Sequence, residues 1–117
     1  MTKLVLVGAG SLQFGTSMLG DIFTSRALDG AEIVLNDING PAAERTLKVA
    51  QDYIAAKGLD HRMSVEMDLK KALVGAAFVV ISIEVGDRFK LWDMDWKIPQ
   101  EYGIPQRYLN TIMSPWA

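Results

Sequence analysis

Short apolar segments typical of β-strands alternate with segments of helical periodicity, and this order constrains the fold of the 117-residue sequence more than any other feature. The strand-like segments lie at residues 3–7, 32–37, 63–67 and 76–84. The helix-like segments lie at residues 12–26, 41–57 and 69–74. Strands that alternate with helices form a parallel sheet with right-handed crossovers, so the sequence predicts an α/β fold.

Residues that start or stop helices support these boundaries. Pro41 suits a first helical turn, and Gly58 is a natural C-terminal stop for the same helix. Asp68 can cap the third helix, and Gly75 ends it. The order of elements predicts the first half of a doubly wound, Rossmann-type parallel sheet with strand order 3-2-1-4.

The first strand runs directly into a glycine-rich turn, in the stretch "LVLVGAGSLQFG". In a strand–loop–helix context, Gly8 permits a tight turn and Gly10 lets the backbone approach a pyrophosphate at the N-terminus of the helix. The dinucleotide-binding fingerprint has a third glycine where this sequence has Gln13, but that glycine serves helix–strand packing, which Gly15 can restore. We therefore expect Gly8, Gly10, Ser11 and Gln13 to bind the cofactor, and Ser11 either adds a hydroxyl to a phosphate or caps the helix. The alternative is a plain turn in which the glycines serve only the backbone.

An acidic residue ends the second strand. A carboxylate at Asp37 would lie beside the glycine loop and accept hydrogen bonds from both ribose hydroxyls of a bound adenosine. It would repel a 2′-phosphate, and no basic residue follows before Arg45, so NAD is favoured over NADP. Asp37 lies 27 residues after Gly10, whereas the usual offset is about 20. The alternative role of Asp37 is that of a turn residue before Asn39-Gly40.

The fourth strand ends in Ser82, Ile83 and Glu84, followed by Gly86. In the predicted strand order these residues face the crevice beside the glycine loop, where the reactive end of a cofactor lies. We therefore include Ser82, Ile83 and Glu84 in the predicted cofactor site. A solvent-exposed Glu84 with no contact to the cofactor is an equal alternative.

Charge and composition exclude several classes of function. The net charge is −2 and the pI is near 5.3, which gives no electrostatic footprint for nucleic acid or an anionic membrane. The sequence has no cysteine, so neither a disulfide nor a thiolate metal site is expected. No apolar run reaches spanning length and no signal-peptide core is found, so we expect a cytoplasmic protein.

Residues 85–117 begin with a glycine loop, and we expect a helix on which Phe89, Trp92 and Trp96 share a face. Because this stretch contains several prolines, we expect an irregular chain from Pro99 onward. Two other features suggest chemistry but are more simply explained. Asp93 and Asp95 could act as an acid and a base, but residues two apart on a helix point to different faces, so we expect both to face solvent. His61, the only histidine, lies in the polar sequence "LDHR", and we expect no chemical role for it.

The segments "VGAGS", "ALVGAAFVVISIEVG" and "WDMDWKIPQEYGIPQ" together resemble the N-terminal part of glycoside hydrolase family 4. The resemblance covers about residues 3–107, so we expect an NAD-binding domain over residues 1–107 and an irregular tail, unlike the family, over residues 108–117. It implies an NAD-dependent glycosidase that oxidises the sugar at C3, eliminates the aglycone, adds water and reduces C3 again. It also implies a divalent metal, often manganese, a sugar substrate and a homo-oligomeric full-length enzyme.

The sequence departs from this family in ways that bear on activity. It lacks the cysteine and the glycine-rich continuation that belong to the metal site, so no catalytic or metal-binding residue can be assigned. We therefore expect no hydrolysis by this chain alone. Sugar-phosphate members carry arginines at positions where this sequence has Glu84 and residues near Trp92, which favours a non-phosphorylated α-glycoside.

Two other classes of function remain open on the sequence alone. A methyltransferase that uses S-adenosylmethionine also has a glycine loop and an acidic end to its second strand, but Leu12 occupies the last glycine position of its usual pattern. A non-enzymatic module that responds to NAD is the third possibility.

Overall fold

A four-stranded parallel sheet forms the centre of the first of two units, residues 1–83 and 84–117, in the computed structural model. The structure describes residues 1–83 and 86–104, except the side chains of Leu12 and Gln13. The strands are β1 (Lys3–Val7), β2 (Glu32–Asn36), β3 (Arg62–Val65) and β4 (Phe78–Ile81). Their order is β3-β2-β1-β4 with every pair parallel, which confirms the predicted α/β fold and strand order.

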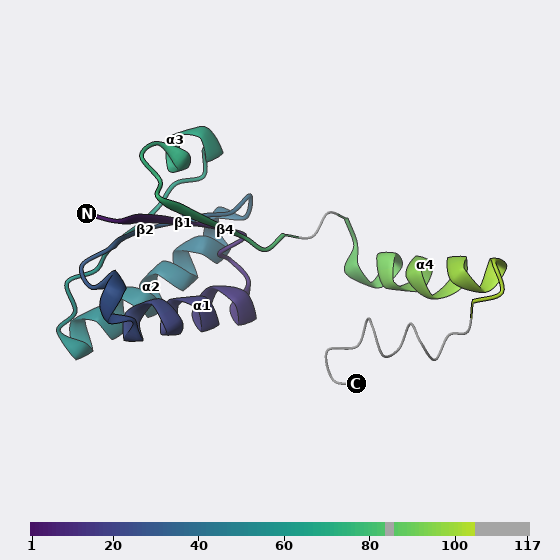
Figure 1. Cartoon of the computed structure of the whole chain (residues 1–117), viewed down its shortest axis with the longest axis horizontal. Coiled ribbons are helices and arrows are strands. Elements are labelled where there is room, and N and C mark those ends of the chain that lie inside the picture. Colours follow the sequence, from purple (N-terminus) through teal and green to yellow (C-terminus); the bar gives the residue numbers. More distant parts are fainter. Residues whose placement is uncertain (84–85, 105–117) are drawn as a thin grey trace. The chain divides into compact units, whose positions relative to one another are not determined.

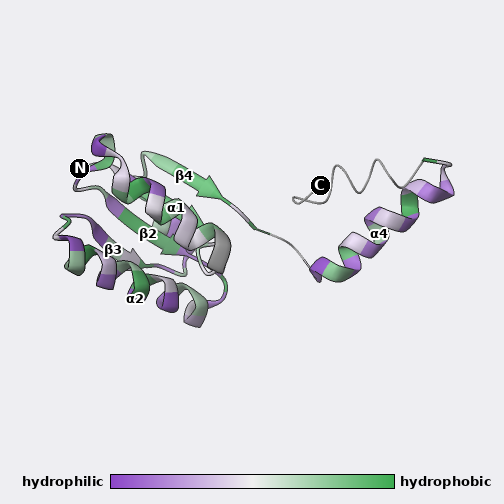
Figure 2. Ribbon diagram, turned by 90° about the horizontal axis from the view of Figure 1, so that it is seen from below, coloured by the Kyte–Doolittle hydropathy of each residue, from purple (hydrophilic) through white to green (hydrophobic). Residues whose placement is uncertain are grey.

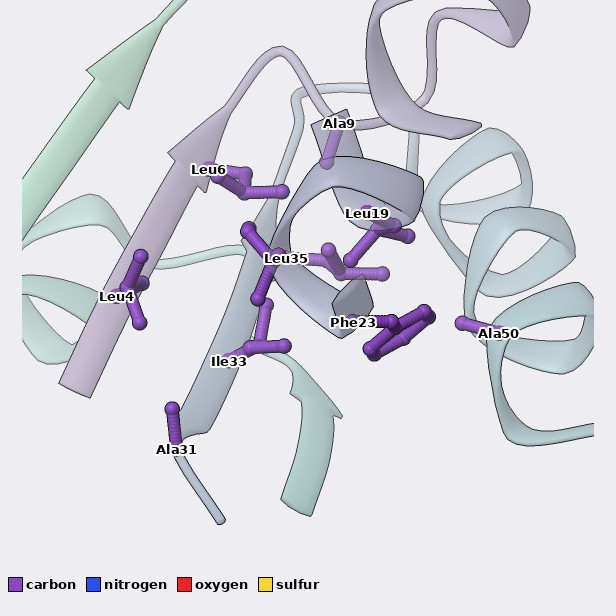
Figure 3. Close-up of a cluster of buried hydrophobic side chains, with 10 residues drawn as sticks. Leu4, Leu6, Ala9, Leu19, Phe23, Ala31, Ile33, Leu35 and Ala50 are labelled. Carbon is purple, nitrogen blue, oxygen red and sulfur yellow. The ribbon is translucent and has the colours of Figure 1, made fainter. Parts of the chain in front are cut away.

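Helices cover both faces of this sheet. They are α1 (Leu12–Thr24), the 3₁₀ turn η1 (Arg26–Leu28), α2 (Gly40–Lys57) and α3 (Leu69–Leu73). Figure 1 shows α1 and α2 together on one side of the sheet and the short α3 on the other. The larger core lies under α1 and α2, where Leu6, Ile33 and Leu35 from the strands meet Leu19 and Phe23 from α1 (Figure 3).

The helix boundaries follow from capping residues. Ser11 caps α1, and its Oγ accepts a hydrogen bond from Phe14 N. Asn39 caps α2 in the same way, and Gly58 ends that helix with a left-handed φ of 63°. Asp68 caps α3, as predicted.

The fourth strand is shorter than the predicted segment 76–84. Its ladder to β1 ends with the bond from Ser82 N to Val7 O at 2.9 Å, because β1 turns away at Gly8 and offers no further partner. Ser82 and Ile83 therefore lie in the loop after β4, and Glu84 lies outside the described residues. The third strand also stops earlier than predicted, at Val65.

The second unit contains the helix α4 (Arg88–Glu101), which begins at its cap Asp87. The irregular chain expected from Pro99 onward begins later than predicted, since Pro99 lies inside the helix, which continues to Glu101. No side chain of α4 is buried, and Figure 2 shows hydrophobic and hydrophilic residues interspersed along it. Among the described residues, no helix has the length and hydropathy to cross a membrane. The predicted tail at residues 108–117 lies outside the described residues.

Candidate functional site

The two glycines of the turn after β1 occupy positions that a larger residue cannot fill. Gly8 has a φ of +92°, and a Cβ there would lie 1.9 Å from the carbonyl oxygen of Ser82. A Cβ on Gly10 would lie 2.7 Å from Ala42 Cβ and 2.7 Å from Asp37 Oδ2. Both glycines are therefore needed for close approach of the loop to its neighbours, whatever else the loop binds.

The end of β2 holds this loop in place. The carbonyl oxygen of Asn36 accepts hydrogen bonds from Gly8 N at 2.8 Å and from Ala9 N at 3.2 Å. The Asn36 side chain donates to the carbonyl oxygens of Glu66 and Met67, just beyond β3. One buried asparagine thus connects the glycine loop, β2 and the end of β3.

Asp37 contacts the glycine loop directly. Its Oδ2 accepts a hydrogen bond from Gly10 N at 2.8 Å, and its Oδ1 accepts one from Asn39 N at 2.8 Å. The structure therefore brings the predicted carboxylate and the predicted phosphate loop together despite the long interval between them in sequence. A carboxylate has about four acceptor positions, so these two bonds leave capacity for hydroxyl groups of a ligand.

The packing task of the missing third glycine falls to Gly15. It lies buried in α1, and a Cβ there would meet the carbonyl oxygen of Ala9 at 2.5 Å and Thr46 Cγ2 at 3.3 Å. Gln13 has its backbone in the first turn of α1, and its side chain lies outside the described residues. Ser11 acts as the cap of α1, beside the N-terminal N–H groups that suit an anion.

The loop after β4 lies against the glycine loop, as predicted. The Ser82 carbonyl faces Gly8, and Ile83 Cγ2 would be 3.2 Å from a Cβ at that glycine. Ile83 is exposed, so its side chain is available to a ligand at this edge of the sheet.

Two buried polar residues that hold the glycine loop, Asn36 and Thr46, were not predicted from the sequence. Thr46 Oγ1 in α2 donates to the carbonyl oxygen of Ala9 at 2.9 Å. For Asn36, a polar residue at the end of an apolar strand was a usable signal. Nothing in the sequence distinguishes Thr46 from an ordinary helical threonine, because its partner lies 37 residues away.

The remaining candidates lie elsewhere. His61 lies in the loop before β3, as its sequence suggested, but its side chain is buried against Phe23, with ring centroids 5.2 Å apart. In α4, Asp93 pairs with Lys97 at 2.8 Å, and Arg88 lies over the ring of Trp92. Over residues 1–83 and 86–104, no three histidine, cysteine or acidic side chains gather in a group that could hold a metal ion.

Comparison with known proteins identifies the family of this chain. The family model described as "Family 4 glycosyl hydrolase" matches residues 3–115. An α-glucosidase of Erwinia rhapontici is 61% identical over 107 residues, which cover 92% of this chain and 24% of that protein. An α-galactosidase of Bacillus subtilis (strain 168) is 30% identical over 96% of this chain and 26% of its own length. The chain thus spans about a quarter of the length of these relatives.

Solved structures share the fold at low sequence identity. The 6-phospho-β-glucosidase of Thermotoga maritima, determined with manganese, NAD+ and glucose-6-phosphate, has a TM-score of 0.70 at 16% identity and matches 87% of this chain and 24% of its own. A malate dehydrogenase of Plasmodium falciparum has a TM-score of 0.60 at 19% identity, over 82% of this chain and 28% of its own. These likenesses establish a Rossmann-type fold, and the family match over nearly the whole chain establishes the family. The chain belongs to glycosyl hydrolase family 4.

Proposed function

We propose that this chain is the NAD-binding part of a family 4 glycosidase. The observation that carries the proposal is the bond of 2.8 Å between Gly10 N and Asp37 Oδ2, because it joins the loop proposed to bind the pyrophosphate to the carboxylate proposed to bind the ribose. The Thermotoga maritima enzyme and a 6-phospho-α-glucosidase from gut microorganisms share the fold and were solved with NAD.

Each residue of the site has a proposed task. Gly8 and Gly10 keep the loop free of side chains where the pyrophosphate approaches, and Ser11 adds a hydroxyl there. The free acceptor positions of Asp37 take the ribose hydroxyls and repel a 2′-phosphate, which selects NAD over NADP. Ser82 and Ile83, with Glu84, border the reactive end of the cofactor.

For the whole enzyme we propose a non-phosphorylated α-glycoside as substrate, supported by the relative named α-glucosidase at 61% identity. The proposed reaction is oxidation at C3, elimination, addition of water and reduction, in which bound NAD would supply the reversible hydride acceptor. The residues described here do not fit the manganese site expected for the family, so no step is assigned to a metal in this chain.

We further propose that this chain binds NAD without hydrolysing glycosides, in the cytoplasm and, in the full-length enzyme, as a homo-oligomer. The absence of cysteine supports the lack of hydrolysis, since the family resemblance calls for one at the metal.

A titration of NAD and of S-adenosylmethionine against the purified chain tests the cofactor. We expect heat of binding with NAD and none with S-adenosylmethionine, and the reverse would identify a methyltransferase site. An assay of α-glucosides, α-galactosides and α-galacturonides with NAD, Mn²⁺ and reductant then tests the expected inactivity. Turnover that persists after removal of host enzymes would contradict it.

A further inference from the structure

We propose that Thr46 is a positioning residue, which fixes the peptide between Ala9 and Gly10 and thereby sets the geometry of the cofactor loop. The inference rests on the proposed NAD site. Thr46 does not belong to the loop or to the set of ligand-binding residues proposed above. It acts from α2, through the loop backbone.

Both ends of the peptide unit between Ala9 and Gly10 are hydrogen-bonded. The carbonyl of Ala9 accepts from Thr46 Oγ1 at 2.9 Å, and the N–H of Gly10 donates to Asp37 Oδ2 at 2.8 Å. Since a peptide unit is rigid and planar, its carbonyl and N–H turn together. Two partners on opposite ends therefore prevent rotation of this unit about its flanking bonds.

Burial makes the carbonyl dependent on Thr46. Ala9 is fully buried and Thr46 is 4% exposed. The backbone of α1 passes so close that a Cβ on Gly15 would lie 2.5 Å from the Ala9 oxygen. A buried carbonyl that loses its partner is costly, and the polar partner found for this carbonyl is the threonine hydroxyl.

The second contact of the hydroxyl does not compete strongly. Thr46 Oγ1 also lies 3.3 Å from the carbonyl oxygen of Ala42, which is the usual partner of a helical threonine four residues back. The bond to Ala9 is the shorter of the two, so the hydroxyl is directed mainly at the loop.

The consequence for the ligand follows from the shared peptide. Without the Thr46 bond the Ala9–Gly10 unit keeps only one of its two hydrogen-bonded ends, which loosens the bond from Gly10 N–H to Asp37. Asp37 then loses one of the two bonds that orient its carboxylate toward a ribose. Loss of the hydroxyl is thus expected to weaken NAD binding without removing any group that contacts NAD.

The test compares Thr46→Val, which keeps the shape and removes the hydroxyl, with Thr46→Ser, which keeps the hydroxyl. Hydrogen exchange of the segment 8–11, followed by mass spectrometry without NAD, measures how firmly Thr46 holds the loop. Calorimetry measures the NAD affinity. We expect Thr46→Val to speed exchange in this segment and to weaken NAD binding about tenfold, and Thr46→Ser to stay near the wild type. If Thr46→Val does not fold, Thr46→Ala, which also lacks the hydroxyl but is smaller, is compared with Thr46→Ser instead.

Thr24→Val is the matched control, because Thr24 makes the same helical hydroxyl bonds, to Gly20 O and Asp21 O, at an exposed site of α1. It should change neither measurement. The inference is overturned if Thr46→Val exchanges and binds like the wild type, or if Thr46→Ser loses as much as Thr46→Val. A wild-type chain that fails to bind NAD would refute the proposed function, while faster exchange in Thr46→Val would still support the role of Thr46 in positioning the loop.

Discussion

Asp37 is the residue on which both the local structure and the proposed recognition depend. Its two oxygens accept from two backbone N–H groups, those of Gly10 and Asn39. An asparagine presents one acceptor and one donor, so at this position a donor would face a backbone N–H. The site therefore requires an acid even before a ligand binds.

We predict that Asp37→Asn lowers the free energy of unfolding by about 1 kcal/mol, because one backbone donor loses its partner. Urea denaturation measures the change. Asp52→Asn, at an exposed position of α2, should leave the stability within about 0.5 kcal/mol of the wild type. Equal stability of the two variants would show that the contacts of Asp37 do not order the loop.

At the scale of elements, the packing of α1 on the loop depends on a glycine outside the usual fingerprint. Gly15 and Gly20 lie in the same helix, but only Gly15 has neighbours within reach of an added Cβ. An alanine at Gly20 therefore reports the helix propensity of alanine alone, whereas an alanine at Gly15 also reports the cost of overpacking.

We predict that Gly15→Ala destabilises the chain by about 1–3 kcal/mol, because the new methyl group meets the carbonyl of Ala9. Gly20→Ala should instead stabilise it by up to about 1 kcal/mol, since alanine favours a helix and nothing lies within 4 Å. Thermal melts of both variants give the comparison. A stabilising Gly15→Ala would mean that α1 does not pack tightly on the loop.

Sequence periodicity was sufficient for the type and order of the elements in the first unit, since buried faces of strands and helices repeat at different intervals. It did not set the end of β4, because that end depends on where the neighbouring strand β1 turns at Gly8. It could not identify Thr46 or the burial of His61, because both depend on contacts with residues distant in sequence. Gly10 and Asp37 could be predicted although 27 residues separate them, because each follows a predicted strand at a position whose chemistry is readable from the residue type.

At the scale of the whole molecule, β4 is an edge strand in the described sheet. Phe78, Val79 and Ile81 are exposed, and residues 76–83 carry no charge. A short uncharged edge with apolar side chains offers unpaired backbone groups to other chains. A net charge of −2 gives little repulsion against such contacts.

We predict that the 117-residue chain associates or is poorly soluble as its concentration rises, and that Val79→Lys reduces this by placing a charge on the edge strand. Val49→Lys, at an exposed position of α2, adds the same charge away from that edge and should have a smaller effect. Size-exclusion chromatography with light scattering measures the mass. A sharp monomer peak and a cooperative melt for the wild-type chain would contradict the prediction.

The central claim is that Gly8, Gly10, Ser11 and Asp37 form an NAD site, and calorimetric titration of the wild type and Asp37→Ala with NAD and NADP tests it most directly. The wild type should bind NAD more tightly than NADP, because the carboxylate accepts from ribose hydroxyls and repels a 2′-phosphate. Asp37→Ala should weaken NAD binding and narrow the difference between the two cofactors. Equal binding of NAD and NADP by the wild type, or an unchanged preference in Asp37→Ala, would contradict the account.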